Sequence, residues 1–395
     1  MQVMESLNWT DLPKELWSII TDSFQSRVDL IRFRSVCSSW HSSLPPPERL
    51  NPPPFPLKFS GDDSGYPGNY ASLFQSTTYL MESLMAEEDS GSSSPSKKPW
   101  LVKFEEDPSS GTMRLLDPVT SSPLRYSPNA TLKQLNLMEY RIVELHKSYG
   151  LKFGENNVTI NSLHKLVLLP RNHLSFGNVY AVFMIYNEGK LGFMRFGDEE
   201  LTYVDVENSY YDDIIVYKGE CYVVDKWGTV SCINSALEVI QVSPPLSCGF
   251  GGKKHLVESY GELYVVDQYY ERVSVRHGRE DDNIFGEYHN SRYDSDAIDF
   301  KVYKLDQEWS KWDNVKNLGD HVFVLSKDGS FCVPTNKEFD GVKGNCIFFI
   351  ERVSPTVRAM YHSRVFDLED GSMRDLASLP ISRMIQPPST WPAMI

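Results

Sequence analysis

The feature that most constrains the fold is an internal repeat in the middle of the chain. Residues 177–182 (GNVYAV) are echoed by residues 219–225 (GECYVVD) and again by 261–267 (GELYVVD). The copies start 42 residues apart (219 − 177 = 42 and 261 − 219 = 42), and a weaker copy at 322–325 follows Gly319. A period of about 40 to 50 residues with several short strands per unit is typical of a β-propeller. Residues 100–385, at about 45 per blade, predict about six blades, with five or seven as alternatives.

Composition agrees with a mainly β fold. The chain has 395 residues, 41% of them hydrophobic and 12% aromatic, with 21 Tyr and 20 Phe. Aromatic and β-branched residues are enriched in strands. A single propeller sheet cannot bury both of its faces, whereas blades around an axis cover one another. The polar stretch at 277–299 lengthens the gap before the fourth copy, and we expect it to be an acidic loop insertion.

The first part of the chain, residues 5–44, predicts helices instead. Asp11 is a good helix cap, and Pro13 is tolerated in a first turn. Apolar residues then follow at spacings of three and four, which places them on one helix face: Leu16, Ile19, Ile20 and Phe24. A second helix is predicted from Asp29, with Leu30, Phe33, Val36, Cys37 and Trp40 at helical spacing. The prolines at 45–47 end the helical part.

About forty residues bury too little surface for an independent fold. Two alternatives follow from the residues alone. Either a partner protein completes the apolar surface of these helices, or the helices form a cap that packs on the domain that follows.

The order of these residues resembles the F-box family. The segments that carry the resemblance are 12–16 (LPKEL), 19–20 (II) and 29–40 (DLIRFRSVCSSW), and they place an F-box at 5–48. The resemblance implies contact with a Skp-type adaptor, which bridges to a cullin scaffold and a RING subunit. The residues that it implies for adaptor binding are Leu12, Pro13, Leu16, Ile19, Ile20, Leu30, Phe33, Val36, Cys37 and Trp40.

Residues 49–99 are rich in Pro, Ser and Gly, and we expect a linker with a first partial strand there. Within it, Asp89-Ser90-Gly91 followed by Ser94 resembles a phosphodegron, a pattern that ubiquitin ligases bind after phosphorylation. The alternative is a plain Ser-rich loop.

A second resemblance covers most of the remaining chain. Residues 99–101, 320–323, 330–334, 341–349, 365–372 and 387–392 are similar, in this order, to the plant F-box family with a KIB-type, kelch-like domain. It implies that residues 100–395 form one KIB-type β-propeller and that kinase-type clients are suitable partners. The sequence departs from the family in the acidic insertion around Asp281 and Asp282, so a client surface at that place does not follow from it.

Charge and cysteine usage narrow the function classes. The formal net charge is −14 and no basic stripe is visible, which argues against nucleic acid and against an anionic membrane surface. No segment has the pattern of a signal peptide or the length of a membrane helix. The six cysteines include no close pair, which predicts free thiols in a reducing compartment, hence the nucleus or the cytoplasm.

The sequence shows no pattern typical of a phosphate-binding loop, a metal site or a nucleophilic catalytic residue. Residues 249–253 (GFGGK) lack the first glycine of a phosphate-binding loop and the Ser or Thr after its Lys. No His or Cys pair has metal-site spacing, and no G-x-S-x-G elbow is present. We therefore expect no catalytic residues, no metal, no cofactor and no enzyme activity, although propeller loops distant in sequence can assemble a site.

The segment 198–213 is the strongest local pattern for client binding, because it holds seven acids and no Lys or Arg. It is either a surface that steers a basic client or a solvated loop. The predicted client-binding residues are Tyr210, Tyr211, Asp212, Asp213, Tyr269 and Tyr270. The sequence thus favours a substrate receptor of an SCF-type (Skp–cullin–F-box) ubiquitin ligase. The alternative is a scaffold or competitor that binds a client, for example a kinase, without degrading it.

Overall fold

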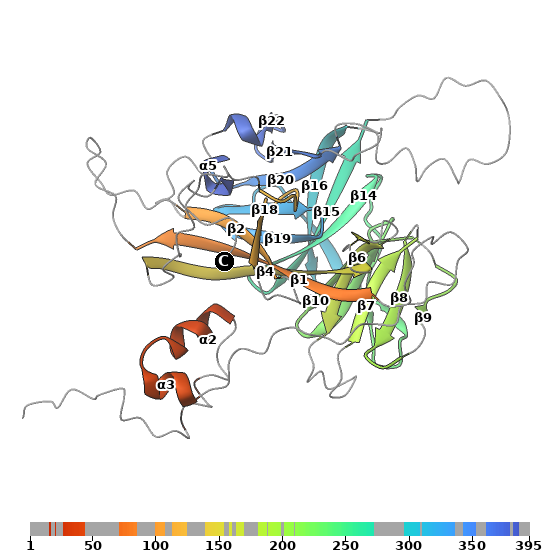
Figure 1. The fold of residues 1–395 in the computed structure, drawn as a ribbon. Helices are drawn as coiled ribbons and strands as arrows, with labels where there is room; N and C mark the ends of the chain where they lie inside the picture. The colour runs from red at the N-terminus through yellow and green to blue at the C-terminus, as the bar shows by residue number, and fades with distance from the viewer. Residues whose placement is uncertain are drawn as a thin grey trace, which may run out of the picture.

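The computed structural model describes residues 16, 20, 27–43, 71–84, 99–106, 113–124, 139–153, 158–159, 163–169, 181–187, 189–198, 201–208, 210–271, 296–308, 310–335, 343–352, 361–379 and 382–386. Most of them lie in antiparallel strands, and the helices are few and short (Figure 1). None of the described helices is long and apolar enough to cross a membrane.

The first two blades belong to one continuous sheet. Blade 1 has the order β3 (Met113–Leu116), β2 (Pro99–Glu106), β1 (Ala71–Ser83) and β4 (Tyr140–Phe153), with β5 (Val158–Thr159) beside β4. Blade 2 runs β6 (Leu163–Leu169), β7 (Ala181–Tyr186), β8 (Lys190–Arg195) and β9 (Thr202–Val204). A single pairing, Tyr149 with Leu166, joins the two blades.

The other blades are separate sheets. Blade 3 is β10 (Tyr211–Tyr217), β11 (Glu220–Asp225), β12 (Val230–Ile233) and β13 (Val239–Gln241). Blade 4 is β14 (Lys253–Ser259), β15 (Glu262–Tyr270), β16 (Ala297–Asp306) and β17 (Lys311–Val315). Blade 5 has the order β19 (Gly329–Pro334), β18 (His321–Ser326), β20 (Cys346–Arg352), β21 (Tyr361–Asp367) and β22 (Met373–Asp375), with β18 and β20 parallel.

The innermost strands β4, β6, β10, β14 and β19 contact one another in this order around a ring, and β19 contacts β4 again. The predicted β-propeller is therefore confirmed. The described strands form five blades, where chain length predicted about six. The difference arises because blade 1 extends from Ala71 to Phe153 and blade 5 has a fifth strand, so both use more chain than an average blade.

The repeat marks structurally equivalent strands. The copies at 219–225 and 261–267 enter β11 and β15, and the copies at 177–182 and 322–325 enter β7 and β18. Each of these strands lies next to the innermost strand of its blade. This position is covered on both faces by neighbouring blades, and all six residues of β7 are buried. Burial on both faces explains why the repeat retains Val and Tyr while the rest of each blade varies.

The ring closes between blade 5 and blade 1 by side-chain packing. Leu80, Leu101 and Val119 of blade 1 share one core cluster with Val324 and Phe348 of blade 5. The 3₁₀ turn η3 (Leu376–Ser378) and helix α5 (Ser382–Ile385) follow β22 and add their apolar residues to the same cluster. The chain end thus seals the seam between the blades.

Gly329, the first residue of β19, occupies its hairpin for a reason other than backbone conformation. Glycine usually serves a tight hairpin by adopting positive φ, as in the Tyr260–Gly261 turn, where both residues have positive φ. Gly329 is not among the positive-φ residues. A Cβ at Gly329 would instead lie 2.2 Å from Nε2 of His146, so lack of space excludes a side chain here.

The propeller begins earlier than residue 100. Strand β1 (Ala71–Ser83) lies in the segment predicted as a linker with a partial strand, yet it pairs along its whole length with β4 and over residues 76–82 with β2. Its Leu80 and Met81 are buried core residues. Segment 49–99 is rich in Pro, Ser and Gly as a whole, although residues 71–83 within it form a full blade strand.

Candidate functional site

The N-terminal helices form the first candidate site. Helix α2 (Arg27–Arg34) is followed by α3 (Ser38–Ser43), and Figure 1 shows both beside the blade 1 side of the propeller. The prediction of one helix from Asp29 to Trp40 was wrong, because the chain leaves the helix after Arg34. Ser35 Oγ donates to the Ile31 carbonyl at 2.7 Å and competes with the helical ladder.

The interruption folds the helices against each other. The rings of Phe33 and Trp40 stack with centroids 4.3 Å apart and planes at 30°. Phe33 is 5% exposed, whereas Val36, at the turn between the helices, is 56% exposed. Stacking of this kind contributes about 0.5 to 1.5 kcal/mol beyond area burial. The stack therefore fixes the turn that presents Val36.

Seven of the ten predicted adaptor contacts fall on described residues. Phe33 lies inside the helix pair, Leu16 is 41% exposed, and Val36 is exposed. Ile20, Leu30, Cys37 and Trp40 are half-buried. Leu12, Pro13 and Ile19 lie outside the described residues. A role in adaptor binding stays a prediction for the whole set.

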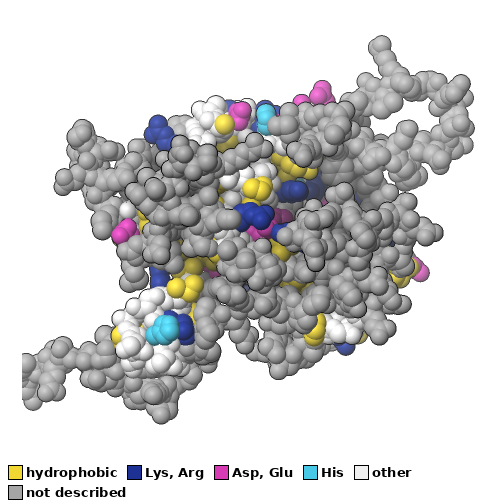
Figure 2. Space-filling model, in the orientation of Figure 1, with side chains coloured by type: hydrophobic (Ala, Val, Ile, Leu, Met, Phe, Trp, Pro, Cys, Tyr) yellow, Lys and Arg dark blue, Asp and Glu magenta, His cyan; other side chains and the backbone are white. Residues whose placement is uncertain are grey.

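The helices contact the propeller at blade 1. Val28 packs against the cluster that contains Tyr79, Val102 and Phe104. Arg32 donates from Nη2 to the main-chain carbonyl of Tyr140. The helical part also carries surface charge: Arg34 Nη2 lies 3.1 Å from Nε2 of His41, and Figure 2 shows a histidine beside a basic side chain there.

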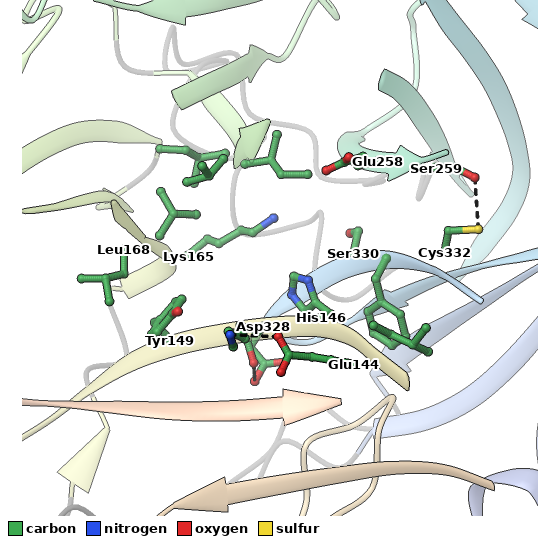
Figure 3. A pocket seen from close by; sticks show the side chains of 18 of the residues that line it. Glu144, His146, Tyr149, Lys165, Leu168, Glu258, Ser259, Asp328, Ser330 and Cys332 are labelled. Carbon is green, nitrogen blue, oxygen red and sulfur yellow. Dashed lines mark hydrogen bonds and ion pairs between the residues drawn. The ribbon is translucent and has the colours of Figure 1, made fainter. Parts of the chain in front are cut away.

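The second candidate site is the channel along the propeller axis. Its larger cavity has a volume of about 510 Å³ and is lined by residues of all five innermost strands, as Figure 3 shows for part of the wall. A smaller cavity of about 290 Å³ shares Lys165 and Ser330 with it. We call the face where β6, β10, β14 and β19 begin the starting face, and the opposite one the ending face. The smaller cavity lies toward the starting face, and the larger one toward the ending face.

Ion pairs between blades line this channel. Lys165 of blade 2 contacts Asp213 of blade 3 at 2.5 Å, and the other Asp213 oxygen accepts from the Leu256 main chain of blade 4 at 2.8 Å. Lys103 of blade 1 contacts Asp328 of blade 5 at 2.5 Å. In Figure 2, charged side chains of both signs lie together in the middle of the molecule. The charges of the channel thus serve mainly to join blades.

The electrostatics of the channel follow from burial and these pairs. Burial, followed by the charges of Lys165 and Lys103, lowers the pKa of His146 from 6.5 to about 3. His146 is therefore neutral near pH 7, and its ring stacks on Phe331 at 5.3 Å. Burial alone would raise the pKa of Asp328, but the Lys103 charge and hydrogen bonds from Lys103 and Ser121 outweigh it and lower that pKa.

The predicted client residues lie on or near the starting face, but two are internal. Tyr211 is 7% exposed and Asp213 is 3% exposed, yet each lines a cavity of this face, so a role in client binding stays a prediction for both. Tyr211 donates to Asp205 at 2.5 Å, and Asp213 joins three blades. Neither alternative for the segment 198–213 included the ion pair between Asp213 and Lys165, because sequence alone does not show which acids have lysine partners.

The other four residues are half-buried, and client binding stays a prediction for them. Asp212 accepts from the Lys254 main chain at 2.9 Å. Tyr269 donates to the Cys248 carbonyl at 2.6 Å, and Tyr270 lines the smaller channel cavity. Tyr210 lies edge-on to Trp227, with ring centroids 5.9 Å apart.

Sequence reasoning missed the most exposed aromatic residues of the starting face. Trp227 is 49% exposed in the turn between β11 and β12, and Phe250 is 83% exposed in the loop between β13 and β14. Their place within turns was the available signal, because turn side chains are seldom covered. Among the described residues, no group of His, Cys, Asp or Glu is arranged to hold a metal ion.

Comparison with known proteins agrees with both parts of the chain. The KIB1-4 beta-propeller family matches residues 73–372. Two Arabidopsis thaliana relatives are Putative F-box protein At1g65770, 30% identical over 92% of this chain and 93% of its own length, and Probable F-box protein At1g65740, 29% identical over 93% and 94%. F-box protein SKIP23 from the same plant is 28% identical over 98% of this chain and 95% of its own length.

Solved structures align at low TM-scores, for example 0.26 for the computationally designed protein Ika8 over 69% of this chain. The assignment therefore depends on the strands themselves, on the family match and on the relatives. The helical start, the ring of blades and full-length relatives named F-box proteins agree. The chain is a plant-type F-box protein and belongs to the KIB1-4 β-propeller family.

Proposed function

We propose that this protein is the substrate receptor of an SCF-type ubiquitin ligase. The helical part binds a Skp-type adaptor, and the propeller holds a protein client near the ubiquitin-charged enzyme. The receptor acts by proximity, because it raises the effective concentration of client lysines at the enzyme. It contributes no catalytic group of its own.

The observation that supports this proposal most is the separation of the two candidate surfaces. The helices contact blade 1 at Tyr140, the first residue of β4, on the ending-face side. The exposed aromatic residues Trp227 and Phe250 belong to loops of the starting face on blades 3 and 4. An adaptor and a client therefore have room to bind at the same time, as a bridging receptor requires.

Capture of a Skp-type adaptor tests the docking half. The full chain should retain the adaptor, and the combined change of Leu12, Pro13 and Trp40 to Ala should abolish retention. The docking proposal fails if the unchanged chain captures no adaptor, or if the triple variant captures it equally well.

A scaffold or competitor is the second candidate, because the propeller matched by the family could hold a client whether or not an adaptor is bound. Client half-life in cells distinguishes the two. With a functional cullin, a receptor shortens the half-life of its client, and the effect disappears when the cullin is inactive. A scaffold leaves the half-life unchanged in both conditions.

A further inference from the structure

The starting face carries an uncovered apolar surface. Val206 is 82%, Trp227 49% and Phe250 83% exposed, and each lies in a loop of this face on blades 2, 3 and 4. Phe250 and Trp227 belong to neighbouring loops, since the Leu246 main chain donates to the Trp227 carbonyl at 3.1 Å. Exposed apolar groups gathered in this way mark interaction surfaces.

A groove of about 450 Å³ runs beside this surface between blades 2 and 3. The rings of Tyr210 and Trp227 line it, perpendicular to each other at 81°. A cation already rests on these rings: Lys226 Nζ lies 3.4 Å from the Tyr210 centroid and 4.4 Å from that of Trp227. Tyr210 and Trp227 belong to the described lining of the groove, whereas Lys226 lies beside it. The rings therefore offer faces that attract cations.

The described lining of the groove is acidic. Asp205, Asp225 and Glu238 line it, and its described lining includes no Lys or Arg. None of the three carboxylates has an ion pair among the described residues, unlike Asp213 and Asp267, which pair with Lys165 and Lys254.

The aspartates of the groove are held in place by hydrogen bonds from their own turns. Asp205 Oδ2 accepts from Asn208 and Tyr211. Asp225 Oδ1 accepts from the main chains of Trp227 and Thr229, and the Thr229 side chain also bonds to this carboxylate. Burial raises the pKa of Asp225, and the hydrogen bonds from Thr229 and Trp227 and the charge of Lys254 offset only part of that rise.

We propose that this groove binds an arginine or lysine side chain of the client, within a segment whose neighbouring residues are apolar. The carboxylates receive the cation, the Tyr210–Trp227 pair covers its alkyl stem, and Phe250 and Val206 contact the flanking apolar residues. Arginine fits best, because its planar guanidinium donates to two carboxylates and stacks on aromatic rings. The inference rests on the proposed function in that it names the chemistry of the client segment.

The test measures binding of labelled peptides to the full chain by fluorescence anisotropy. One peptide alternates Arg with Val, and two analogues replace Arg by Gln or by Glu. The site variant is Trp227→Ala with Asp225→Asn, in which Asn keeps the Oδ1 acceptor of the turn. The control variant is Tyr260→Ala with Glu258→Gln, another exposed aromatic–acid pair, on the ending face.

The Arg peptide should bind at least tenfold more tightly than the Gln analogue, and the site variant should lose at least tenfold in affinity. The control variant should bind as the unchanged chain does. Equal binding of the Arg and Gln peptides overturns the proposal, and so does equal loss in both variants, which indicates general attraction to an acidic protein.

Adaptor capture measured on the same preparations keeps this inference separate from the proposed function. A site variant that loses the peptide but retains the adaptor supports the groove. A chain that binds the Arg peptide but captures no adaptor refutes the receptor function and leaves the groove standing.

Discussion

Lys103 and Asp328 lie 225 positions apart in the chain, yet their side chains form an ion pair of 2.5 Å across the seam that closes the ring. Lys103 is 1% exposed. Ser121 and Ser148 also donate to Asp328, at 3.0 and 3.1 Å. The first and last blades are therefore joined by a hydrogen-bonded charge network as well as by apolar packing.

Breaking this pair should destabilise the protein strongly. Removing one partner of a buried ion pair leaves an uncompensated charge and costs about 3 to 5 kcal/mol. We expect Lys103→Met to lower the free energy of unfolding by about 3 kcal/mol, the lower end of this range. The loss stays at the lower end because Ser121 and Ser148 still donate to Asp328. Denaturant unfolding measures the loss.

The double variant Lys103→Met with Asp328→Leu provides the control. It removes both charges, so it should recover part of the stability that the single change loses. If the double variant is less stable than the unchanged protein by the full sum of the two single losses, the two residues do not act as a pair.

Stability should fall as the pH is lowered from about 7 toward 5. His146 has a folded pKa of about 3, against an ordinary value of 6.5, and burial lowers the pKa of His255 to about 3 as well. In this pH range both histidines bind protons in the unfolded chain but stay neutral in the folded protein, so lowering the pH favours unfolding. Below the ordinary pKa of 6.5, each of these two histidines lowers the free energy of unfolding by about 1.4 kcal/mol per pH unit.

His146→Phe keeps a ring against Phe331 and removes the titrating group. The slope of the unfolding free energy against pH between 6 and 4 should then fall by about 1.4 kcal/mol per pH unit, which is the contribution of one proton. His255→Phe should lower the slope by the same amount. An unchanged slope in both variants would show that neither histidine is held neutral by the fold. Asp328 adds its loss only at lower pH, because its pKa lies below the ordinary 3.8.

Gly329→Ala should destabilise the seam for lack of space. The new Cβ would lie 2.2 Å from His146 Nε2, so the ring or the hairpin has to move. Overpacking of this kind costs about 1 to 3 kcal/mol. Adding His146→Ala should relieve the clash, and the double variant should lose less than the sum of the two single losses. Strict additivity would contradict the contact.

The sequence predicted those features that depend on local pattern. The 42-residue spacing placed equivalent strands correctly, because a residue covered on both faces must be apolar in every blade. The helical spacing of Phe33 and Trp40 predicted rings on the same side, and the rings do stack, although two helices rather than one carry them.

Features that depend on distant partners were not predictable from one sequence. Asp213 belonged to an acidic stretch and gave no sign that Lys165 neutralises it. The sequence around Gly329 does not show that His146 packs against this glycine. That the acids of the groove form no ion pair with a described residue was equally unpredictable, because ion pairs between distant residues follow only from the fold.

Introducing a charge at the exposed turn of the helical part tests the central claim most directly. Val36 is 56% exposed, and Ile298 of β16 is 55% exposed, so Val36→Glu and Ile298→Glu place the same charge at equal exposure. Both variants should fold with unchanged unfolding midpoints. The dissociation constant for a Skp-type adaptor, measured by titration calorimetry, should rise at least tenfold for Val36→Glu and stay constant for Ile298→Glu. Equal adaptor affinity in the two variants would contradict adaptor docking through this surface.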